Sequence, residues 1–295
     1  MESYYDYVRA HPFECKQFSC GNLLFLIHEC PPGFTKGEDW TEHNAFLYVI
    51  AGEHKLSSRE RTWHLVPGTT VFVKKGGLVI ERVDEEAFCA LMFFIPDEFI
   101  RSFMRENRSL VPHAELSVDS GDKILPVRNT AVMHAFYESV LPYFSTNTQP
   151  HENLIQLKFR ELLLNIITNP DNNGLTAHLC RLALTDKDDL LQVMEENCLF
   201  NLQLHEYARI CHRSLSTFKR DFNESYGMSP GKWLLKKRMD AAARLLVNTE
   251  KPVADVVIES GFKNLAHFDR VFKEHFGSSP LQYRKQRSAV NATTA

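Results

Sequence analysis

Two stretches of the sequence, fifty positions apart, follow one pattern. Residues 215–230 read LSTFKRDFNESYGMSP, and residues 265–280 read LAHFDRVFKEHFGSSP. Apolar residues recur at helical spacing in both, which predicts one buried stripe on each helix. The stripe residues are Leu215, Phe218, Phe222 and Tyr226 in the first copy, and Leu265, Phe268, Phe272 and Phe276 in the second. The chain is therefore expected to build one helical unit twice.

The residues around each stripe predict where the helices begin and end. Gly227 and Gly277 follow the stripes, and glycine accepts the left-handed conformation that ends many helices. A Ser-Pro pair comes next in both copies and is typical of a helix start. Upstream helices are expected at 204–210 and 253–259, separated from the striped helices by three to five residues. This is helix-turn-helix spacing, with a long helix at 231–248 joining the two units.

The face opposite each stripe is polar and basic. Arg and Lys on such a helix can donate to guanine in the major groove of DNA, and small apolar groups can meet the thymine methyl. A helical bundle with a solvated polar face would show the same composition once, but two copies with matching basic positions favour DNA binding. The residues on this face are Ser216, Lys219, Arg220 and Asn223 in the first unit, and Ala266, His267, Asp269, Arg270 and Lys273 in the second.

Residues 187–287, about a third of the chain, resemble the tandem helix-turn-helix domain of the AraC/XylS family of transcription regulators. The resemblance is carried by Leu204-x-x-Tyr207-Ala208, Leu215-x-x-Phe218-x-Arg220-x-Phe222, Gly227-x-Ser229-Pro230, Arg238-x-x-x-Ala242-x-x-Leu245-Leu246, Val253-x-Asp255-Val256, Gly261-Phe262, Phe268-x-Arg270-x-Phe272-Lys273 and Gly277-x-Ser279-Pro280-x-x-Tyr283-Arg284.

The resemblance implies two recognition helices in adjacent major-groove segments, on one linker helix. It assigns base contacts to Ser216, Lys219 and Arg220 in the first unit and to Leu265, Ala266, His267 and Arg270 in the second. Asn223 and Lys273 complete the expected DNA-binding set. We expect the first helix to dominate sequence recognition, because Leu265 and Ala266 offer no side-chain hydrogen bond.

Two further features of this region concern the turns between the helices and a basic cluster on the linker helix. The fixed shift of fifty pairs Cys211 in the first turn with Gly261 in the second, so the two turns are expected to differ slightly. The linker-helix cluster Lys236-Lys237-Arg238 is predicted either to contact DNA phosphates or to form salt bridges within the domain.

Charge divides the chain in the same place. Residues 1–186 carry 17 Lys and Arg against 24 Asp and Glu (net −7), and residues 187–295 carry 17 against 13 (net +4). A basic part joined to an acidic part is compatible with nucleic-acid binding, although the excess is small.

The first part of the chain predicts a strand-rich domain. Short β-type runs at 22–28, 45–50, 62–66, 70–73, 78–83 and 87–94 are separated by turn residues, which suggests a barrel or sandwich. The runs around Phe46–Glu53, Trp63–Gly68 and Val71–Gly76 resemble the cupin-like barrel common in this family, closest to the branch with type III secretion activators. Helices are expected at 97–107 and 127–168, with a break at Asp171–Gly174. The predicted fold class is α+β.

The helix expected at 151–168 is apolar most of the way round. Ile155, Phe159, Leu162 and Ile166 form a stripe that predicts a dimerisation surface. A helix sandwiched within a single chain would show the same pattern, and both alternatives stay open.

No site for a metal, a cofactor or catalysis is expected. His43, His54 and His64 lie ten or eleven positions apart, without the tight His-x-His that a metal-binding cupin needs. No nucleophile–base signature, P-loop or glycine-rich dinucleotide motif is found. The seven scattered cysteines form no CxxC pair, which favours reduced thiols.

These observations predict a cytoplasmic, sequence-specific DNA-binding transcription regulator, an activator as most members of the resembled family are. We expect a regulatory and dimerisation domain at 1–170, a linker at 171–186, the DNA-binding domain at 187–287 and a disordered tail at 288–295. The expected partners are double-stranded DNA, RNA polymerase, a second copy of the chain, and a small-molecule effector or a regulatory protein at the first domain, but no membrane. The alternative is a cupin-type small-molecule binder or enzyme with a helical protein-interaction module.

Overall fold

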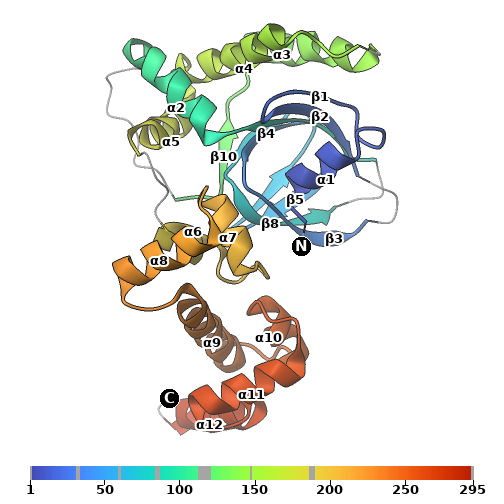
Figure 1. Cartoon of the computed structure of the whole chain (residues 1–295). Coiled ribbons are helices and arrows are strands. Elements are labelled where there is room, and N and C mark those ends of the chain that lie inside the picture. Colours follow the sequence, from blue (N-terminus) through green and yellow to red (C-terminus); the bar gives the residue numbers. More distant parts are fainter. Residues whose placement is uncertain are drawn as a thin grey trace. The chain divides into compact units, whose positions relative to one another are not determined.

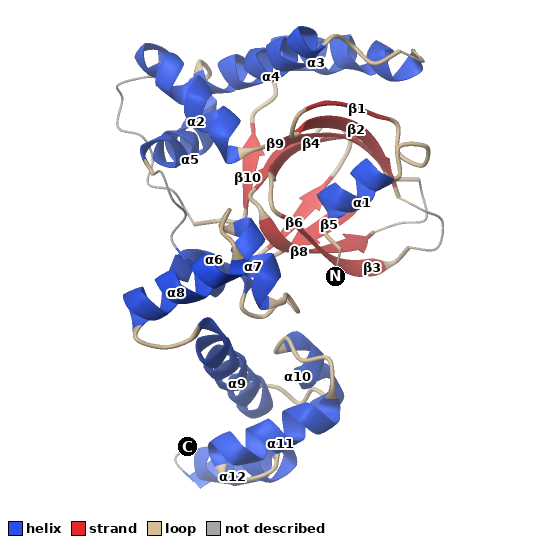
Figure 2. Ribbon diagram, in the orientation of Figure 1, coloured by secondary structure: helices blue, strands red, loops and turns tan. Residues whose placement is uncertain are grey.

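The computed structural model describes residues 2–30, 34–58, 61–83, 87–111, 121–146, 148–185 and 190–293. The chain divides into two compact units, Met1–Asp188 and Asp189–Ala295 (Figure 1). All the described strands belong to the first unit, and the described part of the second is helical (Figure 2). The predicted α+β fold class, with a strand-rich first domain and a helical second one, is confirmed.

The first unit contains two antiparallel sheets. The larger has the order β1 (Gln17–Cys20), β2 (Leu23–Glu29), β9 (Cys89–Ile95), β4 (Asn44–Ala51), β7 (Thr70–Val73) and β10 (Ile124–Val127). The smaller has the order β3 (Lys36–Thr41), β8 (Gly76–Arg82), β5 (His54–Ser57) and β6 (Thr62–Leu65). Leu47 and Val71 of the larger sheet share one buried cluster with Leu56 and Leu65 of the smaller. The two sheets therefore pack face to face, as in the barrel predicted from the sequence.

In the described part of the first unit, five helices accompany the sheets. They are α1 (Tyr4–Ala10), α2 (Asp97–Glu106), α3 (Ala131–Val140), α4 (Glu152–Ile167) and α5 (Asn173–Leu184), with 3-10 turns at Arg108–Leu110, Leu141–Ser145 and Pro170–Asn172. The helical region predicted at 127–168 contains α3 and α4, and α4 corresponds to the helix expected at 151–168. Pro142 and Pro150 lie in the connection, and each lacks the backbone N–H that a continuous helix requires.

The stretch predicted as a linker contains α5. Leu175 and Leu179 of this helix are buried in the core of the first unit, and Arg101 of α2 donates to the carbonyl oxygens of Leu182 and Thr185 at 3.1 and 3.0 Å. Residues 171–185 are therefore part of the first unit, and residues 186–189 lie outside the described residues.

The predicted dimerisation stripe occupies the core of its own chain. Ile155, Phe159, Leu162 and Ile166 are at most 1% exposed, and the ring of Phe159 lies 4.3 Å from that of Phe25 in β2. These four side chains attach α4 to the barrel and are not available to a second chain, which corrects their expected role. The sequence pattern identified a buried stripe but not what covers it.

The second unit consists of seven described helices. They are α6 (Leu190–Asn197), α7 (Leu204–Ile210), α8 (Leu215–Tyr226), α9 (Pro230–Asn248), α10 (Val253–Glu259), α11 (Leu265–Phe276) and α12 (Pro280–Thr293). The backbone of α12 is helical through Thr293, so helix covers most of the tail that was predicted to be disordered from residue 288. No helix among the described ranges is long and apolar enough to cross a membrane.

Candidate DNA-binding surface

The two striped helices, α8 and α11, begin and end in the same way. Ser214 and Asn264 cap them, each accepting a hydrogen bond from a backbone N–H three residues on, at 3.2 and 3.1 Å. Gly227 and Gly277 end them in the left-handed conformation, with φ of 67° and 75°. The predicted glycine stops are confirmed. The upstream helices α7 and α10 match the predicted ranges 204–210 and 253–259.

Each striped helix packs through its two central aromatic residues. Phe218 and Phe222 of α8 are fully buried, as are Phe268 and Phe272 of α11. The ring of Phe222 lies 6.0 Å from that of Trp233 in α9, and the ring of Phe272 lies 5.4 Å from that of Tyr283 in α12. The duplicated sequence thus produces a duplicated packing arrangement.

The leucine at the start of each stripe is not buried. Leu215 is 37% exposed and Leu265 is 47% exposed, so the predicted stripe begins one turn later, at Phe218 and Phe268. Both leucines are the first residue of their helix, before the aromatic contacts begin. Leu265 therefore lies at the surface, where the family resemblance expects it to contact DNA.

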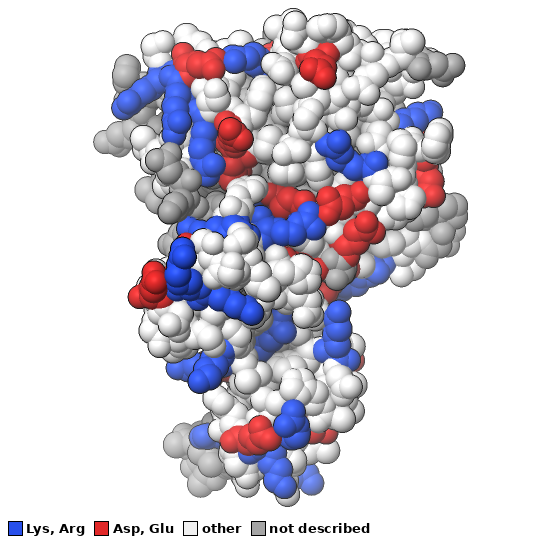
Figure 3. All heavy atoms as spheres, in the orientation of Figure 1, with Lys and Arg blue, Asp and Glu red and all other residues white. Residues whose placement is uncertain are grey.

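Every other residue predicted to contact DNA is also exposed. The exposed set comprises Ser216, Lys219, Arg220 and Asn223 of α8, and Leu265, Ala266, His267, Arg270 and Lys273 of α11. Basic side chains of the helical unit stand in several surface groups, some with acidic neighbours (Figure 3). The polar face of each recognition helix is thus accessible to a ligand.

The two equivalent arginines form ion pairs at the protein surface, with the half-buried Asp221 and the exposed Glu224 and Glu274 as their acidic partners. The Arg220 guanidinium lies 3.0 Å from Asp221 and 4.0 Å from Glu224, and the Arg220 side chain is 65% exposed. The Arg270 guanidinium lies 3.5 Å from Glu274, with the same side-chain exposure. Surface ion pairs of this kind contribute little stability, so both guanidinium groups can exchange a carboxylate for a phosphate or a guanine edge at low cost.

The turns before the recognition helices differ in length by one residue. The backbone N–H of His212 donates to Arg209, and that of Gly261 donates to Ile258, both at 2.9 Å. His212, with φ of 52°, is therefore the counterpart of Gly261, with φ of 84°. This corrects the pairing of Cys211 with Gly261, which assumed a constant shift of fifty, whereas the shift across the turn is 49.

The linker-helix cluster contributes mainly to the domain itself. Arg238 donates to the carbonyl oxygens of Cys198 and Phe200 at 2.9 and 2.7 Å, and Lys237 pairs with Glu195 at 2.8 Å. Lys236 is exposed. Of the two alternatives for this cluster, the internal role describes Lys237 and Arg238.

The other chemical candidates form no reactive site in the described part of the chain. His64 pairs with Glu53 at 2.8 Å, and His54 is 1% exposed. No group of three metal-ligating side chains is found among the described residues. Burial raises the pKa of the Cys15 and Cys180 thiols, which disfavours the reactive thiolate form.

Comparison with known proteins finds matches over both units. Residues 44–178 match the ExsA N-terminal regulatory domain, and residues 207–286 match a helix-turn-helix domain family. The virulence regulon transcriptional activator VirF of Yersinia enterocolitica is 25% identical over 83% of this chain and 90% of that protein. The transcriptional regulator ExsA of Pseudomonas aeruginosa is 25% identical over 83% of this chain and 88% of that protein. Among solved structures, ToxT of Vibrio cholerae is 14% identical, with a TM-score of 0.41 over 90% of this chain and 98% of that chain.

Proposed function

This chain belongs to the AraC/XylS family of DNA-binding transcription regulators, and from that premise we propose that α8 and α11 bind adjacent major-groove segments of promoter DNA. In this proposal Ser216, Lys219 and Arg220 contact bases from α8, and Arg270 with its neighbours on α11 contacts bases or backbone. Asn223 and Lys273, further along each helix, contact phosphates.

One observation carries the proposal. A capped helix with a buried aromatic pair and an exposed arginine occurs twice, with Arg220 and Arg270 at the same position of each. A helix that packs through one face and presents donors on the other fits the major groove. Two such helices on one linker helix would double the contact area without needing a second protein molecule.

The experiment that tests this proposal starts from the full chain and unknown DNA. Selection from fragmented genomic DNA would first identify the preferred site, and titration at several salt concentrations would then count phosphate contacts. The affinity should fall with salt with a slope of about −0.9 per neutralised phosphate. An affinity that does not change with salt, or equal affinity for all fragments, would contradict the proposal.

A matched pair of variants separates recognition from bulk charge. Arg220→Ala should reduce discrimination at one base pair, whereas Lys16→Ala, which removes one exposed charge from the first unit, should leave it unchanged. Equal effects of the two substitutions would mean that Arg220 contributes only net charge.

We further propose that the first unit receives the regulatory signal and that the protein activates transcription by contacting RNA polymerase in the cytoplasm. Its named relatives are transcriptional activators and regulators, which supports this assignment and not an enzymatic one. The signal is either a small molecule or a regulatory protein that binds the first unit. A reporter driven by the selected site should respond to the full chain and not to a variant that has lost DNA binding.

A homodimer remains part of the proposal, on a different face of α4. The outward side of this helix carries Leu157, which is 57% exposed, beside the half-buried Leu154 and Leu164. Val132 of α3 is 60% exposed. If α4 pairs with a second copy, Leu157→Glu should shift the protein to monomer in sedimentation. A monomeric unaltered chain at micromolar concentration would remove the dimer from the account.

A further inference from the structure

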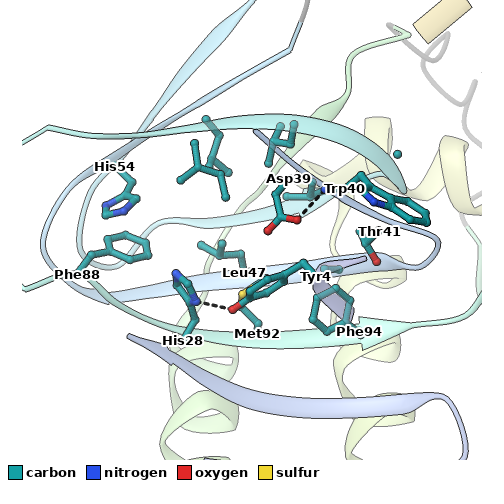
Figure 4. A pocket seen from close by; sticks show the side chains of 16 residues that line it. Tyr4, His28, Asp39, Trp40, Thr41, Leu47, His54, Phe88, Met92 and Phe94 are labelled. Atoms are coloured by element: carbon teal, nitrogen blue, oxygen red, sulfur yellow. Dashed lines mark hydrogen bonds between the residues drawn. The ribbon is translucent and has the colours of Figure 1, made fainter. Parts of the chain in front are cut away.

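The first unit contains a cavity that the DNA-binding account does not use. It lies between strands of both sheets and is bounded on one side by Tyr4 of α1 (Figure 4). Its volume is about 70 Å³. One water molecule needs roughly 10–15 Å³ on such a measure, so the space suits a ligand of roughly five to seven non-hydrogen atoms.

The walls of the cavity are almost entirely apolar. Aliphatic and aromatic side chains from β3, β4, β5, β7, β8 and β9 face one another across it, which favours a ligand with an apolar body. The apolar lining residues include Leu47, Leu56, Leu78, Ile80, Phe88 and Met92.

Two of the polar side chains in the cavity already satisfy each other. The Tyr4 hydroxyl and His28 Nδ1 are hydrogen-bonded at 2.5 Å. Burial lowers the pKa of His28 to about 4, so its ring is uncharged at neutral pH. This pair therefore offers a ligand no charge.

Asp39 of β3 is different, because its carboxylate is only partly satisfied. One oxygen, Oδ1, accepts from the backbone N–H of Trp40 at 2.8 Å, whereas Oδ2 makes no hydrogen bond to any described residue. Figure 4 shows the carboxylate group extending into the cavity. Among the described residues that line this space there is no Lys or Arg. Burial accordingly raises the pKa of Asp39 to about 7.

We propose that this cavity binds a small aliphatic amine as its ammonium ion, which donates to Oδ2 of Asp39 while its alkyl group contacts the apolar walls. An ammonium supplies both the missing donor and the missing positive charge, and charge-assisted hydrogen bonds are the stronger kind. A ligand carboxylate would instead be repelled by Asp39. That such an amine is the signal for transcription rests on the proposed function, but its binding does not.

The test uses three probes of nearly equal shape and the full chain without DNA. Calorimetric titration would compare 3-methylbutylamine, 3-methylbutanol and 3-methylbutanoate at a pH about one and a half units above the pKa of Asp39, where its carboxyl is ionised and the amine stays protonated. The amine should bind about ten-fold more tightly than the alcohol, because one charge-assisted bond replaces a neutral one. The acid should not bind. An alcohol that binds as tightly as the amine, or an acid that binds at all, would overturn the proposal.

Two variants locate the charge that the amine recognises. Asp39→Asn keeps the size of the side chain and its bond from Trp40, and it should weaken amine binding about ten-fold while leaving alcohol binding unchanged. Glu38→Gln removes the neighbouring carboxylate, which is exposed on the same strand, and should leave amine binding intact. If both variants lost the same amount of amine affinity, the amine would be attracted by the general negative charge of the surface, and the proposal would be overturned.

The design also keeps the two proposals apart. If Asp39→Asn does not fold, the three-probe comparison on the unaltered chain decides the question alone. A chain that binds its DNA site but not the amine overturns only the cavity proposal. A chain that binds the amine but no DNA overturns only the DNA-binding assignment.

Discussion

The two helix-turn-helix units have the same helix caps and the same helix packing, but they differ in the turn between their helices. Both use a side-chain cap, a buried phenylalanine pair and a glycine stop. In the first turn the left-handed position is occupied by His212, whereas in the second it is occupied by Gly261. A Cβ atom at Gly261 would lie 2.8 Å from the carbonyl oxygen of Leu199 and 2.9 Å from Nε of Arg238.

The contrast shows where the helical unit is least tolerant of change. Leu199 lies between α6 and α7 and Arg238 belongs to α9, so the turn of the second unit packs closely against these two segments. The first turn accommodates a side chain, since His212 adopts the same backbone conformation. The helices of the two units therefore match, whereas the left-handed position of the turn is occupied by a different residue in each.

The largest effect is expected at Gly261. Gly261→Ala should destabilise the chain by about 2–4 kcal/mol, because it combines a left-handed backbone with a clash against main-chain atoms. Gly227→Ala is the matched control, since φ there is also positive but nothing lies within 4 Å of the added Cβ. That control should cost only about 1–2 kcal/mol. Denaturant unfolding of the full chain measures the stability of both variants. Equal losses of stability would mean that the close approach of Leu199 and Arg238 to Gly261 has no energetic effect.

Next in size is the difference between the two recognition helices in DNA binding. Arg220→Ala should cost about 1–3 kcal/mol of discrimination at one base pair of the selected site. Arg270→Ala should weaken binding to all DNA sequences by a similar amount. Its neighbours Leu265 and Ala266 offer no side-chain hydrogen bond to a base, so α11 is expected to read fewer bases than α8. Competition titrations with single-base variants of the site provide the comparison. If the two variants had identical specificity profiles, the proposal that α8 and α11 contribute unequally to sequence recognition would be contradicted.

The helix caps should give a smaller and nearly equal effect. Ser214→Ala and Asn264→Ala each remove one hydrogen bond to a helix N-terminus and should cost about 1 kcal/mol of unfolding free energy. Thermal unfolding of the two variants side by side measures this. If only one of the two variants lost stability, the N-terminal caps would not stabilise the two helices to the same degree.

The smallest effect is expected at His212. His212→Gly relieves a left-handed non-glycine residue but adds freedom to the unfolded chain, so the net change should stay within about 1 kcal/mol. Denaturant unfolding under the same conditions is the measurement. If His212→Gly lost as much unfolding free energy as Gly261→Ala, the His212 side chain would itself make stabilising contacts.

Much of the helical unit could be predicted because local signals agree with the tertiary structure. The bounds of α7 and α10 and the glycine stops at 227 and 277 follow from spacing and backbone chemistry alone. Pairing by a constant shift of fifty missed the equivalence of His212 and Gly261, although the helices expected at 204–210 and 253–259 are themselves offset by 49. The backbone hydrogen bonds of His212 and Gly261 reveal it, together with those of Arg213 and Phe262 to Ala208 and Val257.

Elements that depend on distant contacts were missed in the first unit. The helix α1 is seven residues long and is held by Tyr5 and Val8, which are buried against the barrel. The strand β3, with sequence KGEDWT, has no apolar alternation to reveal it, yet it supplies Asp39 to the cavity. The apolar stripe of α4 was recognised, but the pattern alone could not decide whether those four side chains contact the barrel of the same chain or a second chain.

Footprinting of the full chain on its selected DNA site tests the central claim most directly. Two protected major-groove segments are expected on one side of the duplex, about one helical turn or 34 Å apart. Arg220→Ala should selectively expose one segment and Arg270→Ala the other. A single protected segment, unchanged in position by either substitution, would contradict the assignment of two DNA-binding helices.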